Sequence, residues 1–213
     1  MRVRPVRPAR VCERAGRKFI EMDFTIETER LRLRPFTLED LPALRAMRAK
    51  EEVSRYLGTS ALQTPEFVAE RLRAYLECYR LHGFGVAAVS EKSGDELIGW
   101  SGLQPLEFGW NGERSAKAEQ EIEVGYSFDS PHWGKGYATE AGAAWLRYGF
   151  EEAGLRRIIA VASPKNRGSW RVMEKLGMRY ETTEQHYGSE CVVYAISREE
   201  FEPQGPYRLL HNS

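Results

Sequence analysis

The 213-residue sequence lacks the features of several large protein classes. It has only three cysteines, Cys12, Cys78 and Cys191, an odd and widely spaced set that makes a poor disulfide framework. Its four histidines are scattered without a paired ligand motif, so no metal site is expected. Long apolar runs are absent as well, since stretches such as residues 158–162 are far too short to span a bilayer. These absences favour a cytoplasmic protein in a reducing compartment, with no membrane partner.

An excess of charge of one sign is also missing. The 31 Lys and Arg residues balance 31 Asp and Glu residues, giving a formal net charge of zero. Because general binding to nucleic acid requires a strong basic excess, no direct nucleic-acid partner is expected. The hydrophobic fraction of 42% and the charged fraction of 29% are typical of a globular protein, and the length predicts one domain. A homodimer is one option for the assembly of this protein.

The first 21 residues differ from the rest of the chain. They contain six Arg and one Lys against two Glu, for a net charge of +5. A secretory signal is excluded because no apolar segment follows these charges, and a transit peptide is disfavoured because serine is scarce. We interpret residues 1–21 as a basic extension that is either disordered or the product of a start upstream of Met22. Residues 22–202 are expected to form the domain, and residues 203–213 a C-terminal tail.

The order of predicted elements is that of a mixed α/β protein. Strands are predicted within residues 24–36 and at 84–89, 97–103, 121–128, 157–162, 178–180 and 191–196. Helices are predicted over residues 37–49, 64–82, 137–152 and 166–176. This order differs from the regular alternation of a doubly wound sheet and favours an α+β fold. Trp145, Tyr148 and Phe150 follow a helical spacing and are expected in the core.

The segment WGKGYAT at residues 133–139 follows a predicted strand and opens a helix. Glycines at 134 and 136 let the backbone direct several N–H groups one way, and a helix N-terminus adds a favourable dipole for phosphate. The segment is neither a Walker loop nor a dinucleotide fingerprint, because Asp129, Gly136 and Thr139 stand where those motifs require other residues. A tight strand-to-helix turn explains the two glycines equally well. The preceding His132 is expected in a surface turn.

Several blocks of the chain together resemble the GNAT N-acetyltransferases, in particular the group containing the ribosomal-protein N-terminal acetyltransferases. The blocks, in the family's order, are TERLRLRP at residues 28–35, LIGW at 97–100, EVGY at 123–126, WGKGYATEA at 133–141 and NRGSWRVMEKLGM at 166–178. The resemblance covers residues 24–201. It implies a single domain with a mixed, mostly antiparallel sheet of about seven strands, splayed near its centre to admit acetyl-CoA.

The same resemblance implies how the cofactor is held, with no metal involved. The N–H groups of residues 134–139 would bind the CoA pyrophosphate, with charge added by Lys135. Trp133 departs from the Arg or Gln that the family usually has there. The pantetheine arm would lie against the strand ending at Phe128, like an added strand, and an N–H near Phe128 would polarise the thioester carbonyl. The implied cofactor-binding residues are Ser127, Phe128, Trp133, Gly134, Lys135, Gly136, Tyr137, Ala138, Thr139, Asn166 and Ser169.

Two residues are expected to carry the chemistry. In similar enzymes the serine at position 169 lies near the CoA sulfur, although Asn166 and Ser169 could equally cap and start a helix. An attacking amine must first lose a proton, and Glu123 is the candidate base. Alternation along the strand places Glu121 on the same face as Glu123, so Glu121 is a geometric alternative, and a solvated acidic face is a third interpretation.

The resemblance implies direct acetyl transfer to a primary amine without an acyl-enzyme. The first acceptor to consider is the α-amine of a protein, such as a ribosomal protein, and the second is a small amine such as an antibiotic or a polyamine. A non-catalytic acyl-CoA-binding regulatory module is the alternative from another class. The polar connection at residues 105–120 is expected to determine acceptor choice. In similar proteins the positions of His186 and Tyr187 lie where the closing strands approach the acceptor, although placement in a loop explains these residues equally well.

Overall fold

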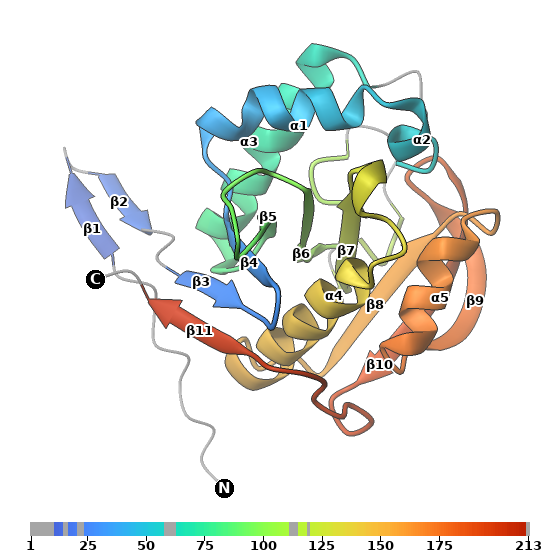
Figure 1. Ribbon diagram of the computed structural model, residues 1–213. Helices are drawn as coiled ribbons and strands as arrows, with labels where there is room; N and C mark the ends of the chain where they lie inside the picture. The colour runs from blue at the N-terminus through green and yellow to red at the C-terminus, as the bar shows by residue number, and fades with distance from the viewer. Residues whose placement is uncertain are drawn as a thin grey trace, which may run out of the picture.

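One large sheet organises the chain in the order β11-β3-β4-β5-β6-β7-β8-β10-β9 (Figure 1). The computed structural model describes residues 24–57, 63–110, 115–118 and 120–211, together with the backbone of residues 11–14 and 17–20. The strands of this sheet are β3 (Phe24–Glu27), β4 (Leu31–Pro35), β5 (Val86–Glu91), β6 (Gly99–Pro105), β7 (Ile122–Phe128), β8 (Arg157–Ala162), β9 (Arg179–His186), β10 (Ser189–Ser197) and β11 (Arg208–His211).

The sheet is antiparallel except at one seam. Strands β7 and β8 run parallel and share a single register pair, Glu123 with Ile159. Beyond Glu123 the two strands diverge, so the expected splay near the centre of the sheet is confirmed. The sheet has nine strands rather than about seven, because residues 24–36 form two strands and β11 adds to the edge.

Helices cover both faces of this sheet (Figure 1). They are α1 (Leu41–Arg48), α2 (Glu51–Ser54), α3 (Pro65–His82), α4 (Tyr137–Arg147) and α5 (Arg167–Lys175), with short 3₁₀ turns at Leu38–Asp40 and Ser130–His132. Thr64 caps α3 by accepting the Phe67 N–H, and Gly83 ends it with a φ of 73°. α4 continues into a π-helical turn at Tyr148–Glu152.

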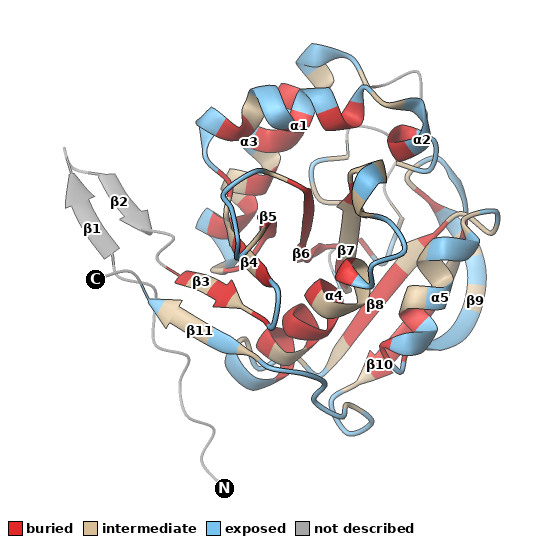
Figure 2. Ribbon diagram, in the orientation of Figure 1, coloured by how far each residue is buried: buried red, intermediate tan, exposed pale blue. Residues whose placement is uncertain are grey.

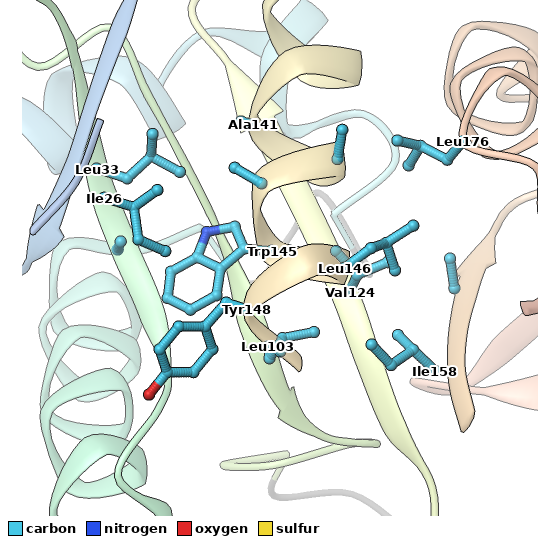
Figure 3. Packing of buried hydrophobic residues seen from close by; sticks show 14 of the residues in the cluster. Ile26, Leu33, Leu103, Val124, Ala141, Trp145, Leu146, Tyr148, Ile158 and Leu176 are labelled. Atoms are coloured by element: carbon cyan, nitrogen blue, oxygen red, sulfur yellow. The ribbon is translucent and has the colours of Figure 1, made fainter. Parts of the chain in front are cut away.

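The larger part of the core lies between the sheet and α4. Trp145 of α4 is fully buried and lies near Leu33, Leu103 and Tyr148 (Figure 3). Buried residues run along α4 and the strands it covers, while outward faces of the helices are exposed (Figure 2). The predicted core positions Trp145, Tyr148 and Phe150 are confirmed.

The opposite face of the sheet packs against α1 and α3. Period-two alternation along β5 explains how one strand serves both faces: Val86 and Ala88 join the cluster under α1 and α3, whereas Ala87 and Val89 join the α4 cluster. The same alternation in β7 sends Val124 into the α4 cluster and turns Glu123 towards α3. This places Glu123 inside the molecule rather than on a solvated face.

The two terminal segments both contain strands. The backbone of β1 (Val11–Arg14) pairs antiparallel with β2 (Arg17–Ile20) within the basic extension, the rest of which lies outside the described residues. Residues 203–213, expected as a tail, supply β11, which pairs with β3 and so joins the sheet. This edge pairing connects distant parts of the chain and has no local sequence signature. Among the helices of the described ranges, none combines the length and apolarity needed to cross a bilayer.

Candidate active site

A cavity of about 280 Å³ opens where β7 and β8 separate. Its lining combines α1 and α3 from one face of the sheet with α5 from the other, and the turn between β9 and β10. Seven aromatic side chains contribute to it: Tyr56, Phe67, Tyr75, Trp100, Trp110, Tyr126 and Tyr187. Of the predicted site residues, the structure brings Glu123, Asn166 and Ser169 together in this lining. A concave cavity that combines aromatic side chains with converging polar and charged groups is typical of a small-molecule site.

Glu123 is a buried carboxylate in the cavity wall, with a relative exposure of 5%. Its Oε1 accepts hydrogen bonds from the Tyr187 hydroxyl and from Gln104 Nε2, the latter at 2.7 Å. Burial raises the pKa of Glu123, although these hydrogen bonds and the nearby Arg71 act in the opposite direction. The carboxylate is therefore held in one orientation and made more basic than an exposed glutamate.

Tyr187 is part of this arrangement rather than of a free loop. Its hydroxyl accepts the Glu107 N–H at 2.8 Å, and Trp110 packs edge-on against its ring. The neighbouring His186 is buried and its Nδ1 lies 3.2 Å from Glu107 Oε1. The sequence left both residues undecided between the acceptor side and a loop, because contacts between positions about 60 to 80 apart leave no local pattern.

Glu121 occupies a different environment from Glu123. Its two carboxylate oxygens each lie 3.2 Å from Arg157 Nε, and it does not line the cavity. An ion pair to a neighbouring strand accounts for Glu121, since β8 begins at Arg157. The structure therefore separates the two glutamates that alternation left equivalent.

Two buried arginines, Arg48 and Arg71, also line the cavity. Both approach Tyr75: Arg48 Nη1 lies 3.3 Å from the Tyr75 hydroxyl, and Arg71 lies 5.1 Å from the ring centroid. Sequence reasoning missed them. A signal was present, because Arg71 stands three residues after Val68 and four before Tyr75, within the buried stripe of α3.

Asn166 and Ser169 fulfil the structural role considered for them and also reach the cavity. Asn166 caps α5 by accepting the Ser169 N–H at 3.2 Å. Ser169 Oγ donates to the Tyr126 hydroxyl at 3.3 Å, and that hydroxyl donates to the Ser169 carbonyl at 2.9 Å. Burial raises the pKa of Tyr126, so its hydroxyl keeps its proton at neutral pH.

Main-chain groups of β7 face the gap beside β8. The Leu106 N–H donates to the main-chain carbonyl of Glu121, and the Asp129 N–H donates to the main-chain carbonyl of Ile98. These two hydrogen bonds mark the ends of the β6–β7 ladder. Antiparallel alternation then turns the N–H and C=O groups of Tyr126 and Phe128 away from β6. Within the described residues β8 pairs with β7 only at Glu123. The N–H and C=O of Tyr126 and the N–H of Phe128 are therefore open to an extended ligand, whereas the Phe128 carbonyl accepts the indole N–H of Trp133.

The glycine loop lies beyond this cavity, and none of residues 133–139 lines it. Gly134 and Gly136 have φ values of 74° and 83°, which glycine adopts without strain, and α4 begins at Tyr137 with Ala138 and Thr139 in its first turn. Trp133 Nε1 donates to the Phe128 carbonyl at 2.7 Å and joins the loop to the end of β7. Ser127 and Phe128 therefore lie between the cavity and the loop.

Arg30 fixes the loop from the outside and was missed in the sequence. Its Nη1 donates to the Lys135 carbonyl at 2.9 Å, and its Nε donates to Glu140 Oε2 at 2.7 Å. Thr28 also donates to Glu140, at 2.6 Å. The turn between β3 and β4 thus holds the N-terminus of α4 in place, and Lys135 remains exposed.

Comparisons with known proteins agree with this geometry. The family model described as "Acetyltransferase (GNAT) domain" matches residues 30–179. The uncharacterized N-acetyltransferase YoaA of Bacillus subtilis is 30% identical over 162 residues, covering 76% of this chain and 86% of YoaA. The uncharacterized protein YkkB of the same organism is 35% identical over 114 residues, 53% of this chain and 62% of YkkB.

A solved structure, Mycobacterium smegmatis RimJ in complex with CoA-disulfide, has a TM-score of 0.68 and 20% identity. That match covers 87% of this chain and 91% of RimJ, so the resemblance in fold to the ribosomal-protein acetyltransferase group is confirmed. Together with the splayed sheet, the family model and the YoaA match show that this chain belongs to the GNAT N-acetyltransferase family.

Proposed function

We propose that this protein transfers an acetyl group from acetyl-CoA directly to the primary amine of a small molecule, with Glu123 as general base. The observation that carries the proposal is the buried Glu123 carboxylate in the wall of a cavity of about 280 Å³ that is lined in part by aromatic side chains. A protonated amine cannot attack a thioester, so a base must accept one proton. The raised pKa of Glu123 brings its basicity closer to that of an amine.

The main chain supports binding of an extended thioester. Acetyl-CoA supplies the acetyl group in activated form when it is bound. We assign the Phe128 N–H to the thioester oxygen, since it faces the gap and negative charge develops on that oxygen during attack. The N–H groups of residues 134–139 would hold the pyrophosphate, helped by the exposed Lys135 and the positive end of the α4 dipole.

The leaving thiolate needs a hydrogen bond or a proton. Ser169 and Tyr126 both line the cavity and bond to each other, which fixes their positions. We assign Ser169 to a hydrogen bond with the sulfur. The Tyr126 hydroxyl, whose pKa burial raises, is too weak an acid to protonate the thiolate and instead orients Ser169 through the hydrogen bond between them.

The cysteine in the lining is a poor candidate for an acyl-enzyme, which supports direct transfer. Cys191 lines the cavity, and burial raises the pKa of its thiol. A neutral thiol is a poor nucleophile compared with its thiolate, so an acyl-cysteine intermediate is disfavoured. The amine is the better nucleophile here once Glu123 has taken its proton.

The experiment that tests this function follows the fate of radiolabelled acetyl-CoA. Purified protein is incubated with a ribosomal-protein extract together with a mixed pool of small amines, and the label is traced. Label in the small-molecule fraction supports the proposal, whereas label in protein assigns the acceptor to a protein α-amine. Cofactor binding without transfer to either fraction would contradict the enzymatic proposal and favour the regulatory module.

A further inference from the structure

Arg48 and Arg71 carry two positive charges into the interior, and neither has a carboxylate partner among the described residues. Their relative exposures are 4% and 8%. Arg48 Nε donates to Gln63 Oε1 at 2.7 Å, and Arg71 Nη1 donates to the Phe108 carbonyl at 2.7 Å, so both are held by neutral groups. Within the described residues no Asp or Glu oxygen lies within 4.0 Å of either guanidinium. Buried charges normally require such a partner.

The two guanidiniums are also close enough to repel each other. Both contact Tyr75, one at its hydroxyl and one over its ring. Burial and the charge of Arg71 together lower the pKa of Arg48. The pKa of Arg71 is instead raised, because its burial is outweighed by Tyr75, Tyr187 and Glu123 together, so Arg48 is the less compensated of the two charges. An anion placed between them would relieve this repulsion.

That anion does not come from the proposed phosphate loop, since none of residues 133–139 lines the cavity. It must belong to the acceptor, which shares the cavity with Glu123. Two further lining residues have buried polar atoms without partners among the described residues: the Trp100 Nε1 donor and the Gln104 Oε1 acceptor. The cavity therefore offers surplus hydrogen-bond donors beside the arginines and surplus acceptors beside Glu123.

From this arrangement we infer that the acceptor is an amine that also bears a carboxylate, such as an amino acid, bound through Arg71 and Arg48. The carboxylate pairs with the two guanidiniums, while the amine lies against Glu123 and Gln104. Arginine suits this role because its planar N–H groups match a carboxylate. The aromatic side chains of Phe67, Tyr75 and Trp100 complete the wall for an apolar side chain. This assignment rests on the proposed acetyl transfer and names its substrate class.

A panel of acids and their amides tests the inference. The standard L-amino acids and the matching amino-acid amides are supplied with acetyl-CoA, and kcat/KM is compared within each pair. The wild-type protein should favour at least one acid over its amide by about tenfold or more, as for loss of a charge-assisted hydrogen bond. Arg71→Met should abolish this preference by lowering kcat/KM for the acid more than kcat/KM for its amide.

Two further variants make the result specific. Arg73→Met removes an exposed arginine from the same helix and should preserve the preference. Arg48→Met gives a second test in case Arg71→Met fails to fold. The inference is overturned if the wild-type protein uses acids and amides equally, or if Arg71→Met lowers both rates equally. The latter outcome would mean that Arg71 acts only by supporting Glu123.

Direct binding separates this inference from the proposed function. Thermal unfolding is followed with each free L-amino acid, with and without CoA. An upward shift of the midpoint in the wild-type protein that is lost in both arginine variants supports the carboxylate site even without turnover. Transfer to amines that lack a carboxylate, with no amino acid bound or acetylated, would overturn the inference and leave acetyl transfer intact. Neither transfer to any amine nor binding of any amino acid would reject both.

Discussion

Glu107 and Tyr187 hold each other through two hydrogen bonds, and both have a positive φ. The Glu107 N–H donates to the Tyr187 hydroxyl at 2.8 Å, and the Tyr187 N–H donates to Glu107 Oε1 at 3.3 Å. Within the described ranges they are the only non-glycine residues with positive φ, at 60° and 53°. A backbone conformation with positive φ costs a non-glycine residue on the order of 1–3 kcal/mol, and it persists only when surrounding contacts impose it. The contacts here direct the Tyr187 hydroxyl onto Glu123.

The first prediction concerns Glu123 itself. Glu123→Gln keeps the shape and the hydrogen bond to Gln104 but removes the base, so acetyl transfer should fall by about 10²- to 10⁴-fold. Affinity for CoA, measured by isothermal titration, should be unchanged. Glu121→Gln is the matched control on the same strand face and should retain the rate. Normal transfer by Glu123→Gln would exclude Glu123 as the base.

The same substitution has a stability consequence with a defined pH dependence. Because the folded-state pKa of Glu123 is raised, its contribution to stability is complete below the ordinary pKa of 4.5 and declines as pH rises through the folded-state value. Glu123→Gln should therefore unfold at a higher temperature than wild type at about pH 8, and the difference should shrink at about pH 4. Thermal melts at the two pH values provide the measurement. A gap that widens on acidification would mean that the folded-state pKa is lowered.

Tyr187→Phe should move the pH profile of transfer. The Tyr187 hydroxyl bond lowers the pKa of Glu123, so its removal raises that pKa further. The acidic limb of kcat/KM against pH should therefore shift to higher pH. The loss of kcat/KM relative to wild type should be smaller on the alkaline plateau than on the acidic limb. A profile that falls uniformly without shifting would assign Tyr187 a purely structural part.

Gly136→Ala tests the phosphate loop. A Cβ at a φ of 83° is strained by roughly 1–2 kcal/mol, and the distorted loop should bind CoA about tenfold more weakly. Gly154→Ala is the control, because Gly154 has a φ of 69°, open space around it and a position after the π-helical turn. Both variants should lose similar stability in thermal melts. Equal CoA affinity in the two would argue against the loop as the binding element.

Trp145→Ala tests the core beneath α4. The side chain is fully buried among Phe24, Tyr148 and their neighbours, so its removal should cost about 3–5 kcal/mol of unfolding free energy. Urea denaturation measures the loss. Trp133→Ala is the comparison: that indole is half exposed, and its loss should affect CoA binding more than stability.

Local signals in the sequence were sufficient for much of the fold. Thr64, Gly83 and Asn166 mark helix ends through bonds to residues within a few positions, and the structure has those ends there. The candidate site was only partly predictable. Arg71 was missed because charged residues are ordinarily assigned to the surface, and the contact between Tyr187 and Glu123 joins positions 64 apart. The pairing of β11 with β3 is equally remote in sequence.

The single register pair between β7 and β8 has a mechanical consequence. It divides the sheet into a six-strand block from β11 to β7 and a three-strand block formed by β8, β10 and β9. A ligand whose amides form hydrogen bonds with β7 would connect the two blocks. Ligand binding should therefore make the sheet more rigid at this seam. Amide protons of Tyr126 and Phe128 should then exchange fast in the free protein and slowly in the loaded one, which makes hydrogen exchange at this seam a direct gauge of occupancy.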